Sequence, residues 1–243
     1  MTVATSQVRV GVRIRPLTSK ESAEGGHAVV DSNAFDRAVS LSKRKFTYDS
    51  VFHSSVTQSD LYSDVAPPLL DAFLNGYNST VLAYGQTGSG KTFTMGSEAH
   101  HGHAGVTFTA DSLGSESPQH ASVGLIPRFM TDIFAMLIRR KESAEKAMRR
   151  SSSGGEGGAG SGSAADALVD FDLSASFLEV YGEDIHDLLD EDRHSLPIRE
   201  DSNGEVIVKG LRNTPIASDA EAMNVLNTGR DMLLQIHSQN ESY

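Results

Sequence analysis

Three short segments in the first third of the chain have the sequence character of β-strands. Residues 7–15 alternate polar and apolar side chains and end at Pro16, which predicts a strand followed by a turn. A shorter strand is predicted at 45–48. An apolar run at 81–84 predicts a third strand, directly before a glycine-rich loop.

Helical spacing of apolar residues appears in three longer segments. The first runs from about 58 to 74, where Pro67 and Pro68 are expected to kink or interrupt the helix. A second helix is predicted to begin near Gly124 and to end in basic residues. Its apolar stripe consists of Ile126, Phe129, Met130, Ile133, Phe134 and Leu137. A capping box formed by Ser218 and Glu221 predicts a last helix from Asp219 to about residue 235.

Between the second and the last helix, the pattern predicts mainly short strands. Residues 168–181 are strand-like, and residues 184–189 are predicted to form a helical turn. Two short strands, at 196–199 and 205–209, flank the turn 203–204 and predict a hairpin. Acidic residues near this region are interpreted as a solvated surface rather than an acid/base site; they are Glu179, Glu183, Asp184 and Asp187.

Two segments lack any sustained period. Residues 97–122 are rich in Ser, Gly and His and are predicted to be an exposed loop. The histidines of this loop, His100, His101 and His103, are interpreted as solvated rather than metal-binding. Residues 150–165 are a low-complexity, Gly- and Ser-rich stretch, predicted to be a disordered insertion. We interpret residues 1–243 as one domain with its core over 7–226.

Composition narrows the class of protein. The chain has 243 residues, 38% of them hydrophobic, and contains neither an apolar run long enough to span a bilayer nor a signal-peptide core. We therefore expect an intracellular protein with no membrane partner. It has no cysteine, which excludes disulfides and thiolate metal sites. The formal net charge of −11 argues against direct binding of nucleic acid across the surface.

The segment with the clearest chemistry is G-Q-T-G-S-G-K-T, which fits the phosphate-binding pattern G-x-x-x-x-G-K-[ST] and follows a predicted strand. Its members are Gly85, Gln86, Thr87, Gly88, Ser89, Gly90, Lys91 and Thr92. A loop can surround a triphosphate only if its backbone N–H groups point inward, which requires positive φ and close approach at glycines. The pattern therefore predicts nucleotide binding.

Each polar group of this segment has an expected role. Lys91 is expected to reach the β- and γ-phosphates, and the Thr92 hydroxyl to ligate Mg²⁺. A helix that begins near Gly90 is expected to add the positive end of its dipole. ATP and Mg²⁺ are thus the expected cofactors.

Residues 75–96, which contain the phosphate-binding segment, resemble the nucleotide-binding core of kinesin motor domains. Three further segments, at 8–16, 124–128 and 177–189, resemble kinesin motifs in the same order along the chain. The resemblance covers about residues 7–226, with gaps at the two loops, and is nearest to the chromosome-associated kinesin-4 branch. It implies an α/β fold, the P-loop NTPase sheet flanked by helices, with the split helix after the loop resuming near Gly124.

The resemblance also implies how the base is held. In kinesins an R-x-R-P element and an aromatic residue after the phosphate loop hold adenine, which implies Arg13, Arg15 and Pro16 along the base and Phe93 stacked on it. From spacing alone, Phe93 is equally well a core side chain of its helix. The resemblance further implies a microtubule as partner and a location in the cytoplasm, on the cytoskeleton.

The chain departs from kinesins near its end. Kinesin motor domains contain an N-x-x-S-S-R-S-H switch and a D-x-x-G-x-E switch that sense the γ-phosphate, and this sequence contains neither pattern. We therefore expect the N-terminal part of a motor domain, an α/β fold incomplete at the C-terminus, with weakened or absent microtubule binding. Phosphoryl transfer needs stabilisation from both sides of the γ-phosphate, so hydrolysis is expected only in a longer parent chain.

Two other functions remain open at this point. One is a different P-loop nucleotide switch in which the kinesin-like segments are incidental. The other is a non-catalytic fragment that acts as an interaction module.

Overall fold

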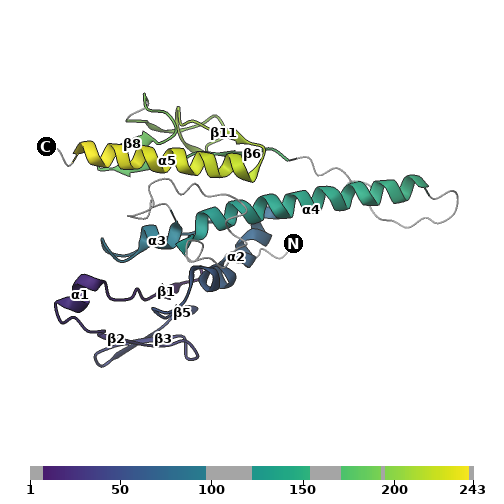
Figure 1. Ribbon diagram of the computed structural model, residues 1–243. Coiled ribbons are helices and arrows are strands. Elements are labelled where there is room, and N and C mark those ends of the chain that lie inside the picture. The colour runs from purple at the N-terminus through teal and green to yellow at the C-terminus, as the bar shows by residue number, and fades with distance from the viewer. Residues whose placement is uncertain (1–7, 97–121, 154–170, 193–194, 241–243) are drawn as a thin grey trace.

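The computed structural model describes residues 8–96, 122–153, 171–192 and 195–240. The predicted α/β class is confirmed, because helices and strands are mixed along the chain (Figure 1). The N-terminal elements are β1 (Gly11–Arg13), α1 (Ser19–Ala23), β2 (Val30–Asn33), β3 (Ala38–Leu41), β4 (Arg44–Thr47), β5 (Ser50–Phe52), α2 (Gln58–Leu74) and α3 (Lys91–Met95). The later elements are α4 (Leu125–Ser153), β6 (Leu173–Ala175), β7 (Leu178–Tyr181), β8 (Asp184–Asp187), β9 (Ile198–Glu200), β10 (Val206–Val208), β11 (Thr214–Ile216) and α5 (Asp219–Asn240).

The helix α4 lies between two groups of elements (Figure 1). On one side, Leu125 is buried with Phe52 of β5 and Leu61 of α2. On the other side, Phe134 is buried with Ile216 of β11 and Ala222 of α5. Of the predicted apolar stripe, Phe129 packs against the first group and Phe134 against the second. The stripe is therefore confirmed, and it is wide enough for its residues to face both groups.

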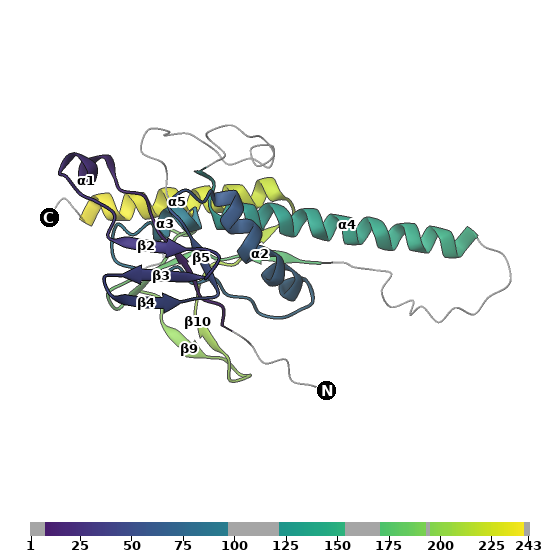
Figure 2. The same cartoon turned by 90° about the horizontal axis from the view of Figure 1, so that it is seen from below.

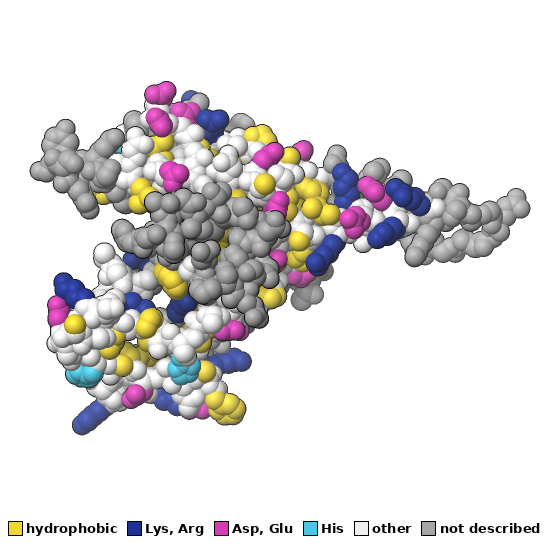
Figure 3. All heavy atoms as spheres, viewed as in Figure 1, with side chains coloured by type: hydrophobic (Ala, Val, Ile, Leu, Met, Phe, Trp, Pro, Cys, Tyr) yellow, Lys and Arg dark blue, Asp and Glu magenta, His cyan; other side chains and the backbone are white. Residues whose placement is uncertain are grey.

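Beyond this packed half, α4 extends away from the rest of the molecule. Figure 3 shows basic and acidic side chains alternating along the extended part, whereas apolar side chains gather where α4 meets its neighbours. The helix continues to Ser153, so the first four residues of the predicted disordered insertion are helical. The remainder of that insertion, and the predicted loop 97–122 except Ser122, lie outside the described residues.

The strands in the described part of the chain form five separate small sheets rather than one continuous sheet. β1 pairs with β5 in parallel, with Val12 opposite Val51. The strands β2, β3 and β4 form an antiparallel sheet in that order, side by side in Figure 2. The strand predicted at 7–15 is thus confirmed only over its central residues, while that at 45–48 corresponds to β4.

The apolar run 81–84 is not assigned as a strand, contrary to the prediction. Val81 packs against the cluster of Phe52, Leu61 and Leu125, whereas Leu82 and Tyr84 are exposed. Side chains therefore still alternate between two faces, as in an extended strand. A strand also requires hydrogen bonds to a neighbouring strand, and no described residue pairs with this segment.

The helix α2 matches its predicted span and continues through Pro67 and Pro68, so of the predicted kink or interruption the interruption is wrong. Leu61 before the prolines and Leu70 after them are both buried. Arg140 of α4 also donates a hydrogen bond to the carbonyl of Leu74 at the end of α2. Packing on both sides of the prolines stabilises the helix against their local cost.

The predicted helical turn at 184–189 is wrong, because residues Asp184–Asp187 form the strand β8. β8 pairs antiparallel with β7 across a two-residue turn in which Gly182 has φ 62°. A glycine at positive φ suits a tight hairpin, and the ladder that the hairpin allows outweighs local helix propensity. The predicted strand 168–181 is likewise two strands, β6 and β7, with different partners.

Asp187 is buried, so the interpretation of the acidic residues as a solvated surface is wrong at this position. Its carboxylate accepts hydrogen bonds from the backbone N–H groups of Leu189, at 2.9 Å, and Arg212, at 2.6 Å. A buried carboxylate needs such donors. Asp187 therefore joins β8 to the segment before β11.

The last two predicted elements are confirmed. β9 and β10 form the antiparallel hairpin, with Ile207 opposite Arg199. The helix α5 begins at Asp219, where the Glu221 N–H donates to the Ser218 hydroxyl, and continues to Asn240. The Glu221 carboxylate accepts from the N–H of Ala217, one residue earlier than a standard capping box.

Gly96 and Gly124, at the two ends of the undescribed loop, lie against one another. α3 ends at Gly96, with φ 82°, and α4 begins directly after Gly124. A Cβ on Gly124 would lie 2.3 Å from the backbone nitrogen of Gly96. The predicted split of the helix after the phosphate loop is confirmed, and its two parts meet at this pair of glycines.

We expect Gly124→Ala to lower the stability of the chain by about 2–3 kcal/mol, because its Cβ would meet backbone atoms that cannot rotate away. The measurement is urea unfolding followed by circular dichroism. Gly25→Ala is the control, since Gly25 has φ 79° and no atom within 4 Å of a Cβ. That substitution should cost about 1 kcal/mol from backbone strain alone. Equal losses for the two variants would contradict a close approach at Gly124.

Candidate nucleotide-binding site

Residues 85–90 of the glycine-rich segment form a loop, and the last two residues of the segment, Lys91 and Thr92, begin α3. Gly88 has φ 76° and Gly90 has φ 94°, both in the left-handed region where glycine is favoured. A Cβ at either position would meet no atom within 4 Å. The backbone at these glycines is therefore accessible from one side, as close approach of a phosphate requires.

Lys91 folds back over the beginning of this loop. Its Nζ donates hydrogen bonds to the carbonyl oxygens of Gly85 and Gln86, both at 2.9 Å. Neutral carbonyl oxygens are weaker acceptors for an ammonium group than charged phosphate oxygens. The lysine is thus held at the loop by contacts that a bound phosphate can replace.

The helix α3 has five residues, Lys91–Met95, and begins after Gly90. So short a helix carries a small dipole, and the expected dipole contribution is correspondingly limited. Thr92, the predicted Mg²⁺ ligand, is the second residue of α3 and is half-buried. Backbone N–H groups of the loop, Lys91 and Thr92 are the groups that fit a phosphate and its metal ion.

Arg13 of β1 lies next to Phe93, the aromatic residue that follows the loop. The guanidinium carbon lies 5.1 Å from the centre of the Phe93 ring, and Nη1 donates to the Thr94 hydroxyl at 2.9 Å. Such a distance is typical of a cation–π contact. Phe93 is 40% exposed, so it is not the core side chain that spacing alone allowed.

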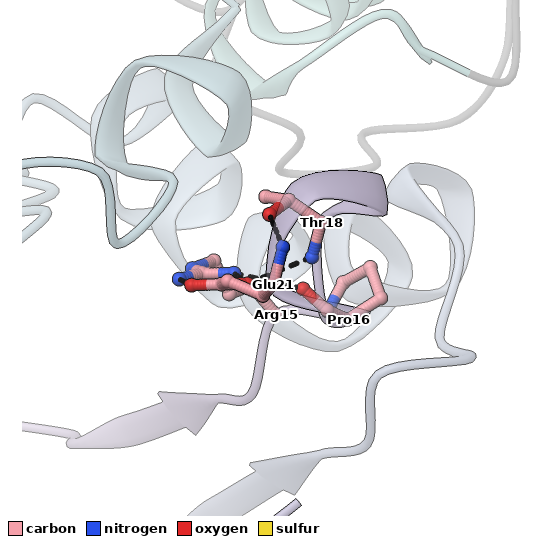
Figure 4. A network of polar contacts seen from close by, with 4 residues as sticks. All are labelled: Arg15, Pro16, Thr18 and Glu21. Atoms are coloured by element: carbon pink, nitrogen blue, oxygen red, sulfur yellow. Dashed lines mark hydrogen bonds and ion pairs between the residues drawn. The ribbon is translucent and has the colours of Figure 1, made fainter. Parts of the chain in front are cut away.

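Arg15 and Pro16 belong to a different network, around the start of α1 (Figure 4). The Arg15 guanidinium binds the Glu21 carboxylate with both terminal nitrogens, one of them at 2.7 Å. Glu21 also accepts from the Thr18 N–H at 2.8 Å, and its own N–H donates to the Thr18 hydroxyl. In the described residues no hydrogen bond or ion pair joins Arg15 or Pro16 to the loop 85–92.

The charges of this network shift the pKa of Glu21. Hydrogen bonds from Arg15 and then from the Thr18 backbone lower the pKa of the Glu21 carboxyl to about 2. The Arg15 guanidinium is in turn stabilised in its charged form, because the Glu21 hydrogen bond raises its pKa. The turn after β1 is therefore held to α1 by an ion pair that persists in mildly acidic solution.

Gln58 and Thr94 take part in this site and were not predicted. Gln58 Oε1 accepts from Arg13 at 2.7 Å, and Gln58 Nε2 donates to the carbonyl of Phe93 at 2.6 Å. A signal was present in the sequence, because Gln58 lies three residues before Leu61 and so shares the buried face of α2. A polar residue in an apolar stripe is a candidate for a buried hydrogen-bonding role.

Other ligand classes have less support in the described part of the chain. No cluster of three or more His, Asp or Glu residues with metal-binding geometry is found there, and His100, His101 and His103 lie outside it. No helix among the described residues is long and apolar enough to cross a bilayer.

We expect Arg15→Ala to raise the pKa of Glu21 from about 2 toward its ordinary value, because the largest cause of the depression is removed. A depressed carboxyl pKa stabilises the fold above the ordinary value, and this contribution is lost as pH falls toward 2. The measurement is a carboxyl ¹³C NMR titration of Glu21, with Arg199→Ala as a remote control. An unchanged midpoint in Arg15→Ala would contradict the ion pair.

Comparison with known proteins supports the resemblance to kinesin motor domains. A family model described as the kinesin motor domain matches residues 13–239. The chain is 37% identical to the kinesin-like protein KIF21B of Homo sapiens over 231 residues, which is 91% of this chain and 12% of that protein. It is 32% identical to the kinesin-like protein kif7 of Danio rerio over 94% of this chain and 14% of that protein.

Kinesin-related protein 8 of Dictyostelium discoideum is 35% identical over 91% of this chain and 10% of its own length. The chain thus spans between about a tenth and a fifth of the length of such relatives. These matches do not resolve the branch within the family, so the kinesin-4 assignment stays a prediction. They remove the alternative of an unrelated P-loop switch, and the chain belongs to the kinesin motor domain family.

Proposed function

We propose that these 243 residues bind ATP with Mg²⁺ and form the nucleotide-binding part of a microtubule motor. The observation that carries the proposal is Lys91, held by two loop carbonyls on a segment in which Gly88 and Gly90 leave the backbone open. Phe93 of α3, with the Arg13 guanidinium of β1 stacked on its ring, suits a purine base. Family membership supports the same ligand.

Each residue has a role that follows from its chemistry. Lys91 supplies a positive charge to the β- and γ-phosphates, and Thr92 supplies a hydroxyl oxygen to the metal ion. Phe93 offers a ring face to the base, and Arg13 backs that ring. Mg²⁺, when bound, neutralises part of the phosphate charge. Arg15 and Pro16 are proposed to border the base, with Arg15 fixed in place by Glu21.

The proposal separates binding from turnover. The sequence contains neither of the two switch patterns that sense the γ-phosphate in kinesins. These residues therefore contact the triphosphate from one side only, whereas phosphoryl transfer needs stabilisation on both sides of the γ-phosphate. We propose ATP binding without measurable hydrolysis by these residues alone, and microtubule-based movement, with a cytoskeletal location, for a longer protein that contains them.

We expect Lys91→Ala to weaken ATP binding at least about tenfold, since it removes a charge-assisted hydrogen bond to phosphate. The measurement is titration with a fluorescent ATP analogue in the presence of Mg²⁺. Lys209→Ala is the control, because Lys209 is an exposed lysine next to β10 and outside the loop. Its affinity should match that of the unaltered chain.

Three results would contradict the proposal. Saturable binding that is unchanged in Lys91→Ala would place the nucleotide elsewhere. An absence of binding by the folded chain would show that the loop is insufficient. Rapid ATP turnover that is stimulated by microtubules would refute the separation of binding from hydrolysis.

A further inference from the structure

Gln58 is an unusual side chain in this fold because it is polar and only 1% exposed. Its amide uses both of its donors and accepts from Arg13. Nε2 donates to the carbonyl of Phe93 at 2.6 Å and to the carbonyl of Ser122 at 3.3 Å. Oε1 accepts from Arg13 at 2.7 Å. One side chain thus joins β1, α2, α3 and the segment that leads into α4.

Only an amide of this length satisfies these partners. A carboxylate would accept from Arg13 but would face the Phe93 and Ser122 carbonyls without a proton to donate. A rotated amide would place its NH₂ group against the guanidinium, which also only donates. The orientation of the Gln58 amide is therefore set by its neighbours, and in turn it sets the direction of Arg13.

Arg13 and Arg15 differ in the groups that bind their guanidinium charges. Arg15 is neutralised by the Glu21 carboxylate. Arg13 is held by two neutral acceptors, Gln58 Oε1 and Thr94 Oγ1, and no carboxylate among the described residues forms an ion pair with it. The Arg13 charge is thus positioned but not cancelled, and it stays available to an electron-rich ligand.

The backbone around Gln58 is also fixed. Gln58 is the first residue of α2 and follows the N-cap Thr57. The Thr57 hydroxyl accepts from the Asp60 N–H at 3.1 Å, and the Asp60 carboxylate accepts from the Thr57 N–H at 3.2 Å. This reciprocal capping box holds the first turn of the helix. Gln58 therefore reaches toward Arg13 from a rigid position.

We propose that Gln58 is a positioning residue for the base of a bound purine nucleotide, which acts by holding the Arg13 guanidinium against the Phe93 ring. The inference rests on the proposed function, since it concerns the same nucleotide. It assigns the base-binding half of the site to Gln58 and Arg13, and leaves the phosphate-binding half to the loop 85–92. Loss of Gln58 should therefore affect ligands with a base and spare ligands without one.

The test compares two ligands in competition against a fluorescent ATP analogue with Mg²⁺. ATP carries a base, and inorganic tripolyphosphate carries the phosphates alone. Gln58→Ala should weaken ATP about tenfold, as expected when a buried charged group loses its hydrogen-bond partner. Affinity for tripolyphosphate should change less than about twofold. Equal weakening of both ligands, or of neither, in folded protein would overturn the proposal.

Two further variants address folding. Gln58→Met keeps the side-chain length without the hydrogen bonds, so it should reproduce the loss of ATP affinity if Gln58→Ala proves unstable. Tyr62→Phe is the matched control, because it removes a 2.7 Å hydrogen bond between α2 and Asp132 of α4 and does not touch Arg13 or Phe93. Tyr62→Phe should lower stability while both ligands keep their affinity.

A double-variant cycle tests whether Gln58 acts through Arg13. Arg13→Ala should weaken ATP on its own, and adding Gln58→Ala should then cause no further loss. Additive losses would mean that Gln58 contacts the base independently or acts through the fold, and would overturn its assignment as a positioning residue for Arg13.

A fluorescence measurement made in the absence of nucleotide separates this inference from the proposed function. The chain contains no tryptophan, so Phe93→Trp supplies a single tryptophan, at the stacking position, whose emission can be followed selectively. Adding Gln58→Ala should increase quenching of that tryptophan by acrylamide, because the guanidinium no longer covers the ring. Increased quenching without ATP binding would refute the proposed function and, with it, the role in base binding. Unchanged quenching would refute the positioning of Arg13.

Discussion

The structure depends on the burial of the first half of α4 between two groups of elements. Leu125 packs with Phe52 and Leu61 on one side, and Phe134 packs with Ile216 and Ala222 on the other. Burying a side chain of this size stabilises the fold by about 1.5–3 kcal/mol. The sheets of this chain are small and separate, so each gains little from its own ladder. The helix is thus the element against which the two groups are held.

This packing also positions the candidate site. α4 begins where α3 ends, because Gly96 and Gly124 are in contact across the undescribed loop. The carbonyl of Ser122, just before α4, accepts from Gln58 of α2. The same side chain reaches Arg13 and the carbonyl of Phe93. The core around α4 and the polar contacts of Gln58 therefore locate the strand that bears Arg13 and the helix that bears Phe93.

The two arginines of the R-x-R-P element make different contacts in the fold. Arg13 is directed inward by neutral partners and stacks on Phe93. Arg15, two residues later, points to Glu21 and ties the turn to α1. Residues two apart in sequence face the same side only while a strand continues, and β1 ends at Arg13. The chain therefore turns after the first arginine, and the second meets a different environment.

The sequence by itself determined the family, the phosphate loop and the longer helices, because each depends on local spacing: the glycines and Lys91 of residues 85–92, or the apolar stripes of α2, α4 and α5. Tertiary structure decided the rest. The run 81–84 is not a strand without a paired neighbour, residues 184–187 form a strand because β7 lies beside them, and Asp187 is buried because backbone donors meet it there. Gln58 likewise acquires its role only from β1 and α3. Strand pairing and buried polar contacts join residues far apart in sequence, so local patterns do not contain them.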